Sequence, residues 1–319
     1  MNAVELRYPK AENVGSIHRL LLFERFKQAE SLKNANEIQY SMNIMFARER
    51  FMAVANWLVG NQAEDGSWPI GTRRDFTPRI YLTPGWCSAM GQGQGISVLV
   101  RAAHVSLGEA KRRFLLAAAR ALDPFYRYPV HHQMMPPPAS HNESRLCGVR
   151  ADFLGQTELP WYEEYPAKPS VFVLNGFIFS LVGLFDLSST QMMTDEDVNL
   201  TTSRARSLLA QGVNTLVQVL PLYDSGIGSF YDLRHLSLEY SFQSTKPMAR
   251  LEREKPGQMS TLQALLSAGP NRARWDYHTV HMNQLYQLAA VIAPQHADLW
   301  NVFFDRWMAY AWGFRSDHN

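Results

Sequence analysis

Two adjacent carboxylates, Glu163 and Glu164, stand between aromatic residues in the stretch WYEEYP. The rings of Trp161, Tyr162 and Tyr165 can stack on sugars and limit the access of water. Such surroundings raise the pKa of a carboxyl group toward a value that suits general acid–base catalysis. The alternative interpretation is a pair of solvated loop acids, the commoner arrangement for an isolated pair of glutamates.

Prolines surround these acids at positions 160, 166 and 169. Because a proline ring fixes φ, they predict a stiff, extended segment. Ser170 is predicted to cap the helix that follows. The acids are therefore expected on a rigid loop at the start of a helix.

A second polar group lies in the stretch SGIGSFYDLRH, residues 225–235. Two glycines followed by an aromatic and aliphatic run predict a short β-hairpin. Alternation along a strand would place Tyr231 on one face and Asp232 and Arg234 on the other. Arg234 can bind a carboxylate through two parallel hydrogen bonds.

The stretch WDYHTVHMNQL opens a helix with Tyr277 in its first turn, followed by His278 and His281. The three-residue spacing of the histidines can suit zinc, but no HExxH pattern accompanies it, so we predict no metal. Tyrosines usually pack with the hydroxyl toward water. Tyr165, Tyr231 and Tyr277, each beside a charged residue at the start or turn of an element, instead favour a functional role.

The elements that position these residues are predicted to be mainly helices. Apolar residues recur at intervals of three and four in long segments, and turn-forming stretches separate them. The fold class is therefore mainly α, with paired helices and a short β-hairpin. The helical segments lie at about 42–60, 88–107, 109–125, 172–187, 203–220, 278–292 and 297–312.

The turn NQAEDGSWPI is predicted to be structural. Gly66 permits a tight turn, Asp65 can bond nearby backbone, and Trp68 can pack between neighbouring helices. This pattern is typical of toroids that are built from helical hairpins.

The glycines of SAMGQGQGIS resemble a phosphate loop, but no strand precedes them and no Lys-Ser/Thr pair follows. We therefore predict no nucleotide cofactor. Gly91, Gly93 and Gly95 are expected to allow close helix packing, with Gln92 or Gln94 turned toward a cleft.

Bulk properties exclude little. The net charge of +2 on 319 residues gives no reason to expect a nucleic-acid partner. Cys87 and Cys147 are too few for a disulfide framework, and their redox state stays open.

No apolar stretch reaches the roughly 20 residues that span a bilayer. Residues 1–30 lack the features of a signal peptide, which is expected either of a cytoplasmic protein or of a fragment without its targeting end. Asn142 and Asn199 begin glycosylation sequons.

Three segments are predicted to lie outside the main body. Residues 1–35 are expected to form an N-terminal arm before a domain over 36–319. Residues 131–144 contain a triple proline, and residues 239–260 are polar and broken by prolines, so both are expected to be exposed loops.

Taken together, PGWCSAMGQGQGISVLVRA, WYEEYP, FVLNGF, LPLYDSGIGSFYDLRH and ARWDYHTVHMNQL closely resemble the carboxy-terminal region of the D-glucuronyl C5-epimerases of heparan sulfate and heparin synthesis. The resemblance runs in order from about residue 42 to the closing RSDHN. It implies an incomplete α/α toroid and an isomerase that converts glucuronic acid to iduronic acid in N-sulfated heparosan. It also implies a Golgi location, a heparosan or heparan sulfate partner, a homodimer and contacts with other enzymes of heparan sulfate synthesis. The family's amino-terminal domains and membrane anchor have no counterpart here, and Cys87 replaces an expected aromatic residue.

The resemblance also assigns roles to residues. Glu164, Tyr277 and Tyr231 are expected to be catalytic. The expected substrate-binding residues are Tyr165, Arg234, Asn175, Trp161 and His278.

This chemistry explains the residue types. The C5 proton lies beside a carboxylate, so its removal builds an enediolate-like state that needs positive charge or hydrogen-bond donors. Arg234 can supply that charge, and His278 or His281 could assist. Inversion requires one proton-transfer group on each face of the sugar, and Glu164 and Tyr277 come from different elements. Which of the two acts first is not assigned.

Two rival functions remain. A polyuronate lyase removes the same proton but expels the C4 substituent, leaving unsaturated ends that absorb ultraviolet light. A non-catalytic glycosaminoglycan-binding module would use the aromatic rings for sugar and residues such as Arg73, Arg74 and Arg79 for sulfates.

Overall fold

The computed structural model describes residues 37–76, 81–129, 146–190, 196–237 and 270–315, with the backbone alone at 37–44 and 196–199. The predicted arm, both predicted loops and the sequon at Asn142 lie outside these residues, as does the side chain of Asn199.

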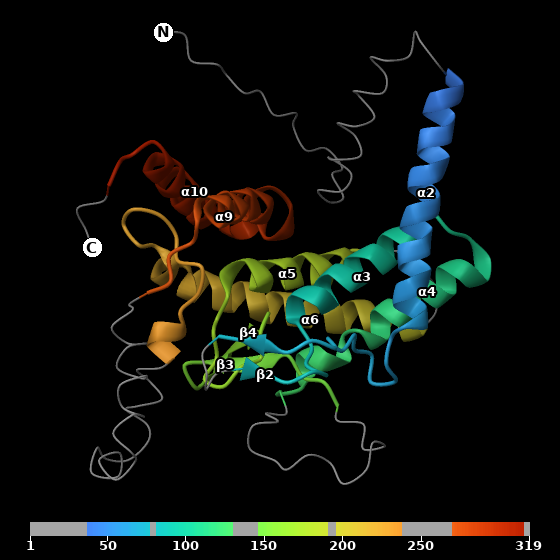
Figure 1. The fold of residues 1–319 in the computed structure, drawn as a ribbon, viewed down its shortest axis with the longest axis horizontal. Coiled ribbons are helices and arrows are strands. Elements are labelled where there is room, and N and C mark those ends of the chain that lie inside the picture. The colour runs from blue at the N-terminus through green and yellow to red at the C-terminus, as the bar shows by residue number, and fades with distance from the viewer. Residues whose placement is uncertain (1–36, 77–80, 130–145, 191–195, 238–269, 316–319) are drawn as a thin grey trace. The chain divides into compact units, whose positions relative to one another are not determined.

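The described chain is mainly helical, which confirms the predicted fold class (Figure 1). Each predicted helical segment contains a helix; the toroid arrangement stays a prediction. The helices are α2 (Glu37–Gly60), α3 (Ala89–His104), α4 (Gly108–Arg120), α5 (Leu174–Ser188), α6 (Glu196–Val219), α9 (Trp275–Gln287) and α10 (Ala297–Ala311). Shorter helical turns lie at Asp123–Tyr126, Leu220–Tyr223, Leu288–Ile292 and Pro294–His296.

The chain divides into two compact units, residues 1–53 and 54–319, with the boundary inside α2. In the described part of the first unit, the Arg50 guanidinium lies 4.1 Å from the centre of the Phe46 ring. The second unit contains all other described elements, including every predicted site residue.

Helix α5 packs against both α3 and α6, and α9 packs against α10 (Figure 1). Glycines allow the close approach of α3 and α5. A Cβ atom on Gly93 would lie 2.6 Å from Ser180 Cα, and one on Gly183 would lie 2.0 Å from the Gly93 carbonyl oxygen. The predicted packing role of the α3 glycines is therefore confirmed at Gly93.

Gln92 does not face a cleft. It is buried, and its side-chain nitrogen donates to the carbonyls of Gly66 and Ala121, at 3.1 and 3.2 Å. Its side-chain oxygen accepts the Trp68 backbone N–H at 3.0 Å. The α3 glutamine thus fixes the preceding turn.

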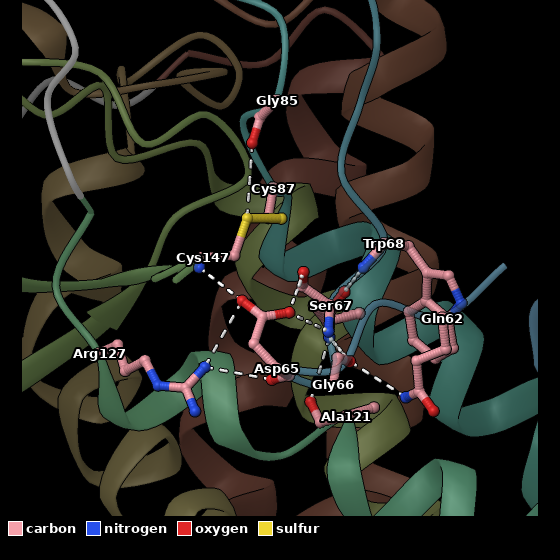
Figure 2. The surroundings of a disulfide bond; sticks show 11 residues. Gln62, Asp65, Gly66, Ser67, Trp68, Gly85, Cys87, Ala121, Arg127 and Cys147 are labelled. Atoms are coloured by element: carbon pink, nitrogen blue, oxygen red, sulfur yellow. Dashed lines mark hydrogen bonds and ion pairs between the residues drawn. A yellow bond between two sulfur atoms is a disulfide. The ribbon is translucent and has the colours of Figure 1, made fainter. Parts of the chain in front are cut away.

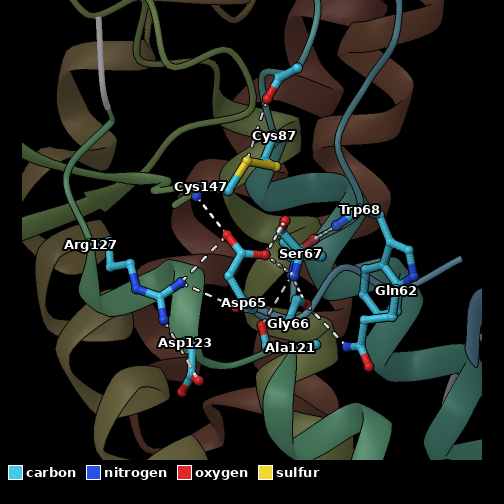
Figure 3. A network of polar contacts seen from close by, with 12 residues as sticks. Gln62, Asp65, Gly66, Ser67, Trp68, Cys87, Ala121, Asp123, Arg127 and Cys147 are labelled. Carbon is cyan, nitrogen blue, oxygen red and sulfur yellow. Dashed lines mark hydrogen bonds and ion pairs between the residues drawn. A yellow bond between two sulfur atoms is a disulfide. The ribbon is translucent and has the colours of Figure 1, made fainter. Parts of the chain in front are cut away.

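That turn has the structure predicted for it (Figure 3). Asp65 Oδ1 accepts hydrogen bonds from the Ser67 backbone at 3.0 Å and the Ser67 hydroxyl at 2.6 Å. The Trp68 indole donates to the Leu58 carbonyl at 2.8 Å, which joins the turn to the end of α2.

Cys87 and Cys147 form a disulfide, with Cα atoms 6.0 Å apart (Figure 2). Asp65 Oδ2 accepts the Cys147 backbone N–H at 2.7 Å, and the Arg127 guanidinium lies 3.7 Å from the same oxygen. The bond connects the start of α3 with the chain just before β3 (Arg150–Phe153).

The described part of this unit contains two small antiparallel sheets. β1 (Arg74–Asp75) pairs with β2 (Tyr81–Leu82), and β3 pairs with β4 (Gln156–Tyr162). The stretch WYEEYP therefore begins within a strand rather than in a loop, because Trp161 pairs with Ala151.

The predicted hairpin at 225–235 forms only at its turn. A tight turn is closed by a bridge between Asp224 and Ser229, but the following residues bridge elsewhere, Phe230 to Arg272 and Asp232 to Val173. The segment therefore pairs with itself only at the turn, and its later residues join two distant parts of the chain.

Replacing Gly66 with alanine is expected to destabilise the fold. Gly66 has a φ of +84°, and a Cβ atom there would lie 1.9 Å from the Arg120 carbonyl oxygen. Gly85→Ala is the matched control, since Gly85 has a φ of +97° but open space around it. Gly66→Ala should lower the free energy of unfolding by about 1–3 kcal/mol more than the control, as measured by denaturant titration. Equal losses would exclude the steric contact as the cause.

Candidate active site

The backbone of Glu163 is fixed between two elements. Its N–H donates to the Val149 carbonyl at 2.7 Å, and its carbonyl accepts the Ala89 N–H at 2.8 Å. Ser170 does not cap a helix as predicted, because α5 begins at Leu174, with Val173 before it and no side-chain cap. The paired acids therefore follow β4 directly and lie against the start of α3.

The side chain of Glu163 is fully buried. Neither carboxyl oxygen makes a hydrogen bond of regular geometry. Burial raises the pKa of Glu163 to about 8, although the nearby Ser170 hydroxyl and Phe172 backbone oppose the shift. Glu163 is thus a neutral acid at pH 7.

Glu164 is also buried, with 3% of its surface exposed. Burial raises its pKa to about 7, while a hydrogen bond from Tyr165 and the charge of Arg74 lower it. Such a carboxyl group can accept or donate a proton at neutral pH. The interpretation of these glutamates as solvated loop acids is wrong.

Gly176, in the first turn of α5, makes room for Glu164. A Cβ atom at position 176 would lie 2.2 Å from Glu164 Oε2 and 2.4 Å from Glu164 Cβ. Any larger residue would displace the carboxyl group. No local sequence pattern predicts this role of Gly176.

Three tyrosines follow one another from Glu164, and the four residues form the acid–tyrosine cluster (Glu164, Tyr165, Tyr231 and Tyr277). The Tyr165 hydroxyl bonds to Glu164, and the Tyr231 hydroxyl bonds to Tyr165. The ring centres of Tyr231 and Tyr277 are 4.7 Å apart, edge to face. The structure thus brings together four residues that the sequence suggested separately.

The cluster is closed at one end and open at the other. Burial is the main cause that raises the pKa of Tyr165 to about 12, and it raises that of Tyr231 further. Both hydroxyls therefore stay protonated and can act as hydrogen-bond donors at neutral pH. Tyr277 is 38% exposed, so solvent or a ligand can reach this end.

Arg234 is held by a buried acid. Its Nε donates to the two carboxylate oxygens of Asp232 at 2.8 and 3.0 Å, and its Nη2 donates to Oδ2. Asp232 is fully buried and also accepts a hydrogen bond from Asn271 at 2.7 Å. This ion pair orients Arg234 but offsets much of its charge.

Aromatic rings pack against the other side of Tyr165. Its ring centre lies 5.2 Å from that of Phe76 and 5.7 Å from that of Trp86. The Arg74 guanidinium lies 5.3 Å from the Tyr165 ring. From the sequence, Arg74 was predicted only as a sulfate ligand of the rival binding module. Its position beside Tyr165 depends on the pairing of β1 with β2, which the local sequence does not predict.

Trp161 is a core residue, and its predicted contact with substrate is wrong. It is fully buried and stacks on Phe177, with ring centres 3.8 Å apart. Asn175 is buried at the start of α5, where its carbonyl accepts a hydrogen bond from Gln284 at 3.0 Å. The side-chain oxygen of Asn175 is buried without a partner, so its contact with sugar stays a prediction.

His278 is also structural, which corrects its predicted contact with substrate. Its Nδ1 accepts the Ser229 backbone N–H at 3.2 Å, and its Nε2 therefore donates to the Trp307 carbonyl at 3.0 Å. His281 Nδ1 lies 2.8 Å from the Ser229 hydroxyl, and burial lowers the pKa of His281 to about 3. Neither histidine can supply positive charge to a substrate at neutral pH.

The buried proton of Glu163 is expected to make stability depend on pH. Its pKa rises from 4.5 to about 8 on folding, so the unfolded chain releases a proton that the folded protein keeps. Stability should therefore fall as pH rises from about 4.5 to about 8, by up to about 1.4 kcal/mol per pH unit. Urea titrations of wild type and Glu163→Gln at several pH values would test this, since the variant should lose that part of the dependence. Parallel curves would contradict it.

Among the described residues, no helix is both long and apolar enough to cross a membrane.

Comparison with known proteins places these residues in a wider context. A family model described as the D-glucuronyl C5-epimerase C-terminus matches residues 62–248. A D-glucuronyl C5-epimerase of Caenorhabditis elegans is 37% identical over 297 residues, which are 91% of this chain and 40% of that protein. An uncharacterised protein of Methanocaldococcus jannaschii is 25% identical over 222 residues, 69% of this chain and 63% of that protein. The chain thus spans less than two thirds of the length of either relative.

Proposed function

The chain belongs to the D-glucuronyl C5-epimerase family, and from this premise we propose that it inverts C5 of D-glucuronic acid to give L-iduronic acid in N-sulfated heparosan. The observation that carries the proposal is the acid–tyrosine cluster. It joins a buried carboxyl group with a pKa near 7 to the hydroxyl of its neighbour Tyr165 and to that of Tyr231 from a distant segment.

Glu164 is the base of the forward reaction. As a carboxylate it takes the C5 proton, and the electron pair left on carbon is delocalised into the uronate carboxylate as an enediolate. The Tyr277 hydroxyl then delivers a proton to C5 from the opposite face. A proton returned through solvent from the Glu164 carboxyl group to the Tyr277 phenolate completes the cycle.

The cluster favours this order of events. The Glu164 carboxylate is substantially ionised at neutral pH, whereas burial keeps the hydroxyls of Tyr165 and Tyr231 protonated. These two hydroxyls can hold Glu164 in place and donate hydrogen bonds, but they are poor bases. Tyr277 is more exposed than either and can meet a sugar from the other side.

The decisive experiment is deuterium uptake at C5 when the full chain is incubated with N-sulfated heparosan in heavy water. Uptake with iduronate formation in an intact polymer is the expected result. A polyuronate lyase would shorten the polymer and create ends that absorb ultraviolet light. Polymer binding without uptake, from a sample with a cooperative melt, would leave only the binding module.

The disulfide supports a location in the secretory pathway. Disulfides persist in oxidising compartments and are rare in the cytosol, and Cys87 and Cys147 are paired here. A Golgi location, a homodimer and contacts with other enzymes of heparan sulfate synthesis belong to the same proposal. Localisation of the tagged chain and sedimentation of the purified chain would test the first two.

A further inference from the structure

The proposed reaction requires a positive charge close to the uronate carboxylate. Removing a proton beside a carboxylate gives the uronate a second negative charge, which a preorganised cation must stabilise. Two arginines lie beside the acid–tyrosine cluster on the same ring: the guanidinium of Arg74 is 5.4 Å from the centre of Phe76, and that of Arg234 is 5.8 Å from it. The arginine that stabilises the substrate should be the one whose positive charge is not already neutralised by a protein carboxylate.

Arg234 is committed to another carboxylate. Its Nε and Nη2 donate to Asp232, which is fully buried. If Arg234 moved away, Asp232 would remain as a buried charge without a partner, which would strongly destabilise the fold. A substrate carboxylate would have to share a guanidinium whose charge is already offset.

Arg74 differs in this respect, since within the described residues no carboxylate lies in ion-pair distance of it, whereas Arg73 pairs with Asp75 and Arg234 with Asp232. Its guanidinium lies 5.3 Å from the Tyr165 ring, and its charge acts on Glu164. Its side chain is exposed and can therefore meet a ligand.

The backbone below Arg74 is fixed. Arg74 pairs with Leu82 across β1 and β2, and Leu82 belongs to a buried apolar cluster with Val171 and Val173. Phe76 and Tyr165 pack on that cluster, and the Arg74 guanidinium lies close to both rings. The adjacent Arg73 instead pairs with Asp75 at 2.8 Å.

We propose that Arg74 is the residue that binds the uronate carboxylate and stabilises the charge that develops on it, while Arg234 serves mainly to hold Asp232 and the neighbouring segment. This inference rests on the proposed epimerase function, because a uronate at the acid–tyrosine cluster is its premise. Arg74 reaches the carboxylate from the Tyr165 side of the cluster.

The test compares Arg74→Gln with Arg73→Gln, a matched control one residue away. Each variant is assayed for iduronate formation and for binding to two polymers, N-sulfated heparosan and its carboxyl-reduced derivative. Arg74→Gln is expected to lower kcat/KM and the affinity for native polymer by roughly tenfold or more, the scale of a charge-assisted hydrogen bond. It should leave affinity for the carboxyl-reduced polymer unchanged, whereas any effect of Arg73→Gln should be the same with both polymers.

Two outcomes would overturn the inference. Equal loss of affinity for both polymers would mean that Arg74 binds a sulfate, and wild-type affinity for native polymer would mean that it binds nothing. Failure of the proposed function is recognised separately, because wild type itself would then form no iduronate. The binding comparison does not require turnover and decides the role of Arg74 in either case.

Discussion

Glu164→Gln is expected to lower the rate of deuterium uptake at C5 by roughly a hundredfold or more, the usual scale for a positioned acid–base group. An amide cannot take the C5 proton, and glutamine fills nearly the same volume beside Gly176. The loss should therefore appear in kcat, with little change in affinity for N-sulfated heparosan. Deuterium uptake under saturating polymer measures it directly.

The neighbouring Glu163→Gln is the matched control. Glu163 is buried and carries its proton at neutral pH, so a neutral amide of similar shape should preserve most of the activity. A wild-type rate in Glu164→Gln, at unchanged thermal stability, would remove Glu164 from the mechanism. A large loss in Glu163→Gln alone would exchange the roles of the two acids.

The members of the acid–tyrosine cluster lie in distinctive short stretches, and the resemblance that these stretches carry singled out Glu164, Tyr231 and Tyr277. It could not give the burial of the acids, which arises from contacts with residues far along the chain. Ala89 and Val149 fix the backbone of Glu163, and Gly176 accommodates the side chain of Glu164. These neighbours turn two ordinary glutamates into groups with raised pKa values.

The predictions of a loop at WYEEYP and of a hairpin at 225–235 failed for the same reason. Prolines near WYEEYP suggested a loop, but β4 pairs with β3 and directs Trp161 into the core beside Phe177. Two glycines before Tyr231 predicted a hairpin over 225–235, but beyond the turn the chain bridges to Val173 and Arg272 instead. In each case a pairing between distant segments overrode the local pattern.

The helices were predicted more reliably because their pattern is local. Apolar spacing located α3, α5 and α6, and the α3 glycines indicated close packing before any partner helix was known. The disulfide illustrates the opposite case. Its two cysteines are 60 residues apart, and only the folded arrangement of the α3 start and the β3 segment brings them together.

Tyr277→Phe is expected to separate the two halves of the reaction. If Glu164 removes the C5 proton and Tyr277 returns one from the opposite face, the variant can still deprotonate glucuronate but cannot complete inversion. Iduronate formation should fall by roughly a hundredfold or more. Deuterium should still enter the remaining glucuronate, because Glu164 can exchange its proton with solvent and return a deuteron to the same face. Mass spectrometry of the disaccharides, resolved by uronate type, measures both products.

Tyr286→Phe is the control on the same helix, where its ring centre lies 6.5 Å from that of Phe304; it should retain wild-type rates of both uptake and inversion. Equal loss of exchange and inversion in Tyr277→Phe would instead mean that Tyr277 starts the forward reaction as the base. Inversion at the wild-type rate would assign the second proton transfer to another donor, and Tyr231, whose ring contacts that of Tyr277, would be the first to substitute. The ratio of exchange to inversion thus assigns a face of the sugar to each group, which a loss of total activity alone cannot do.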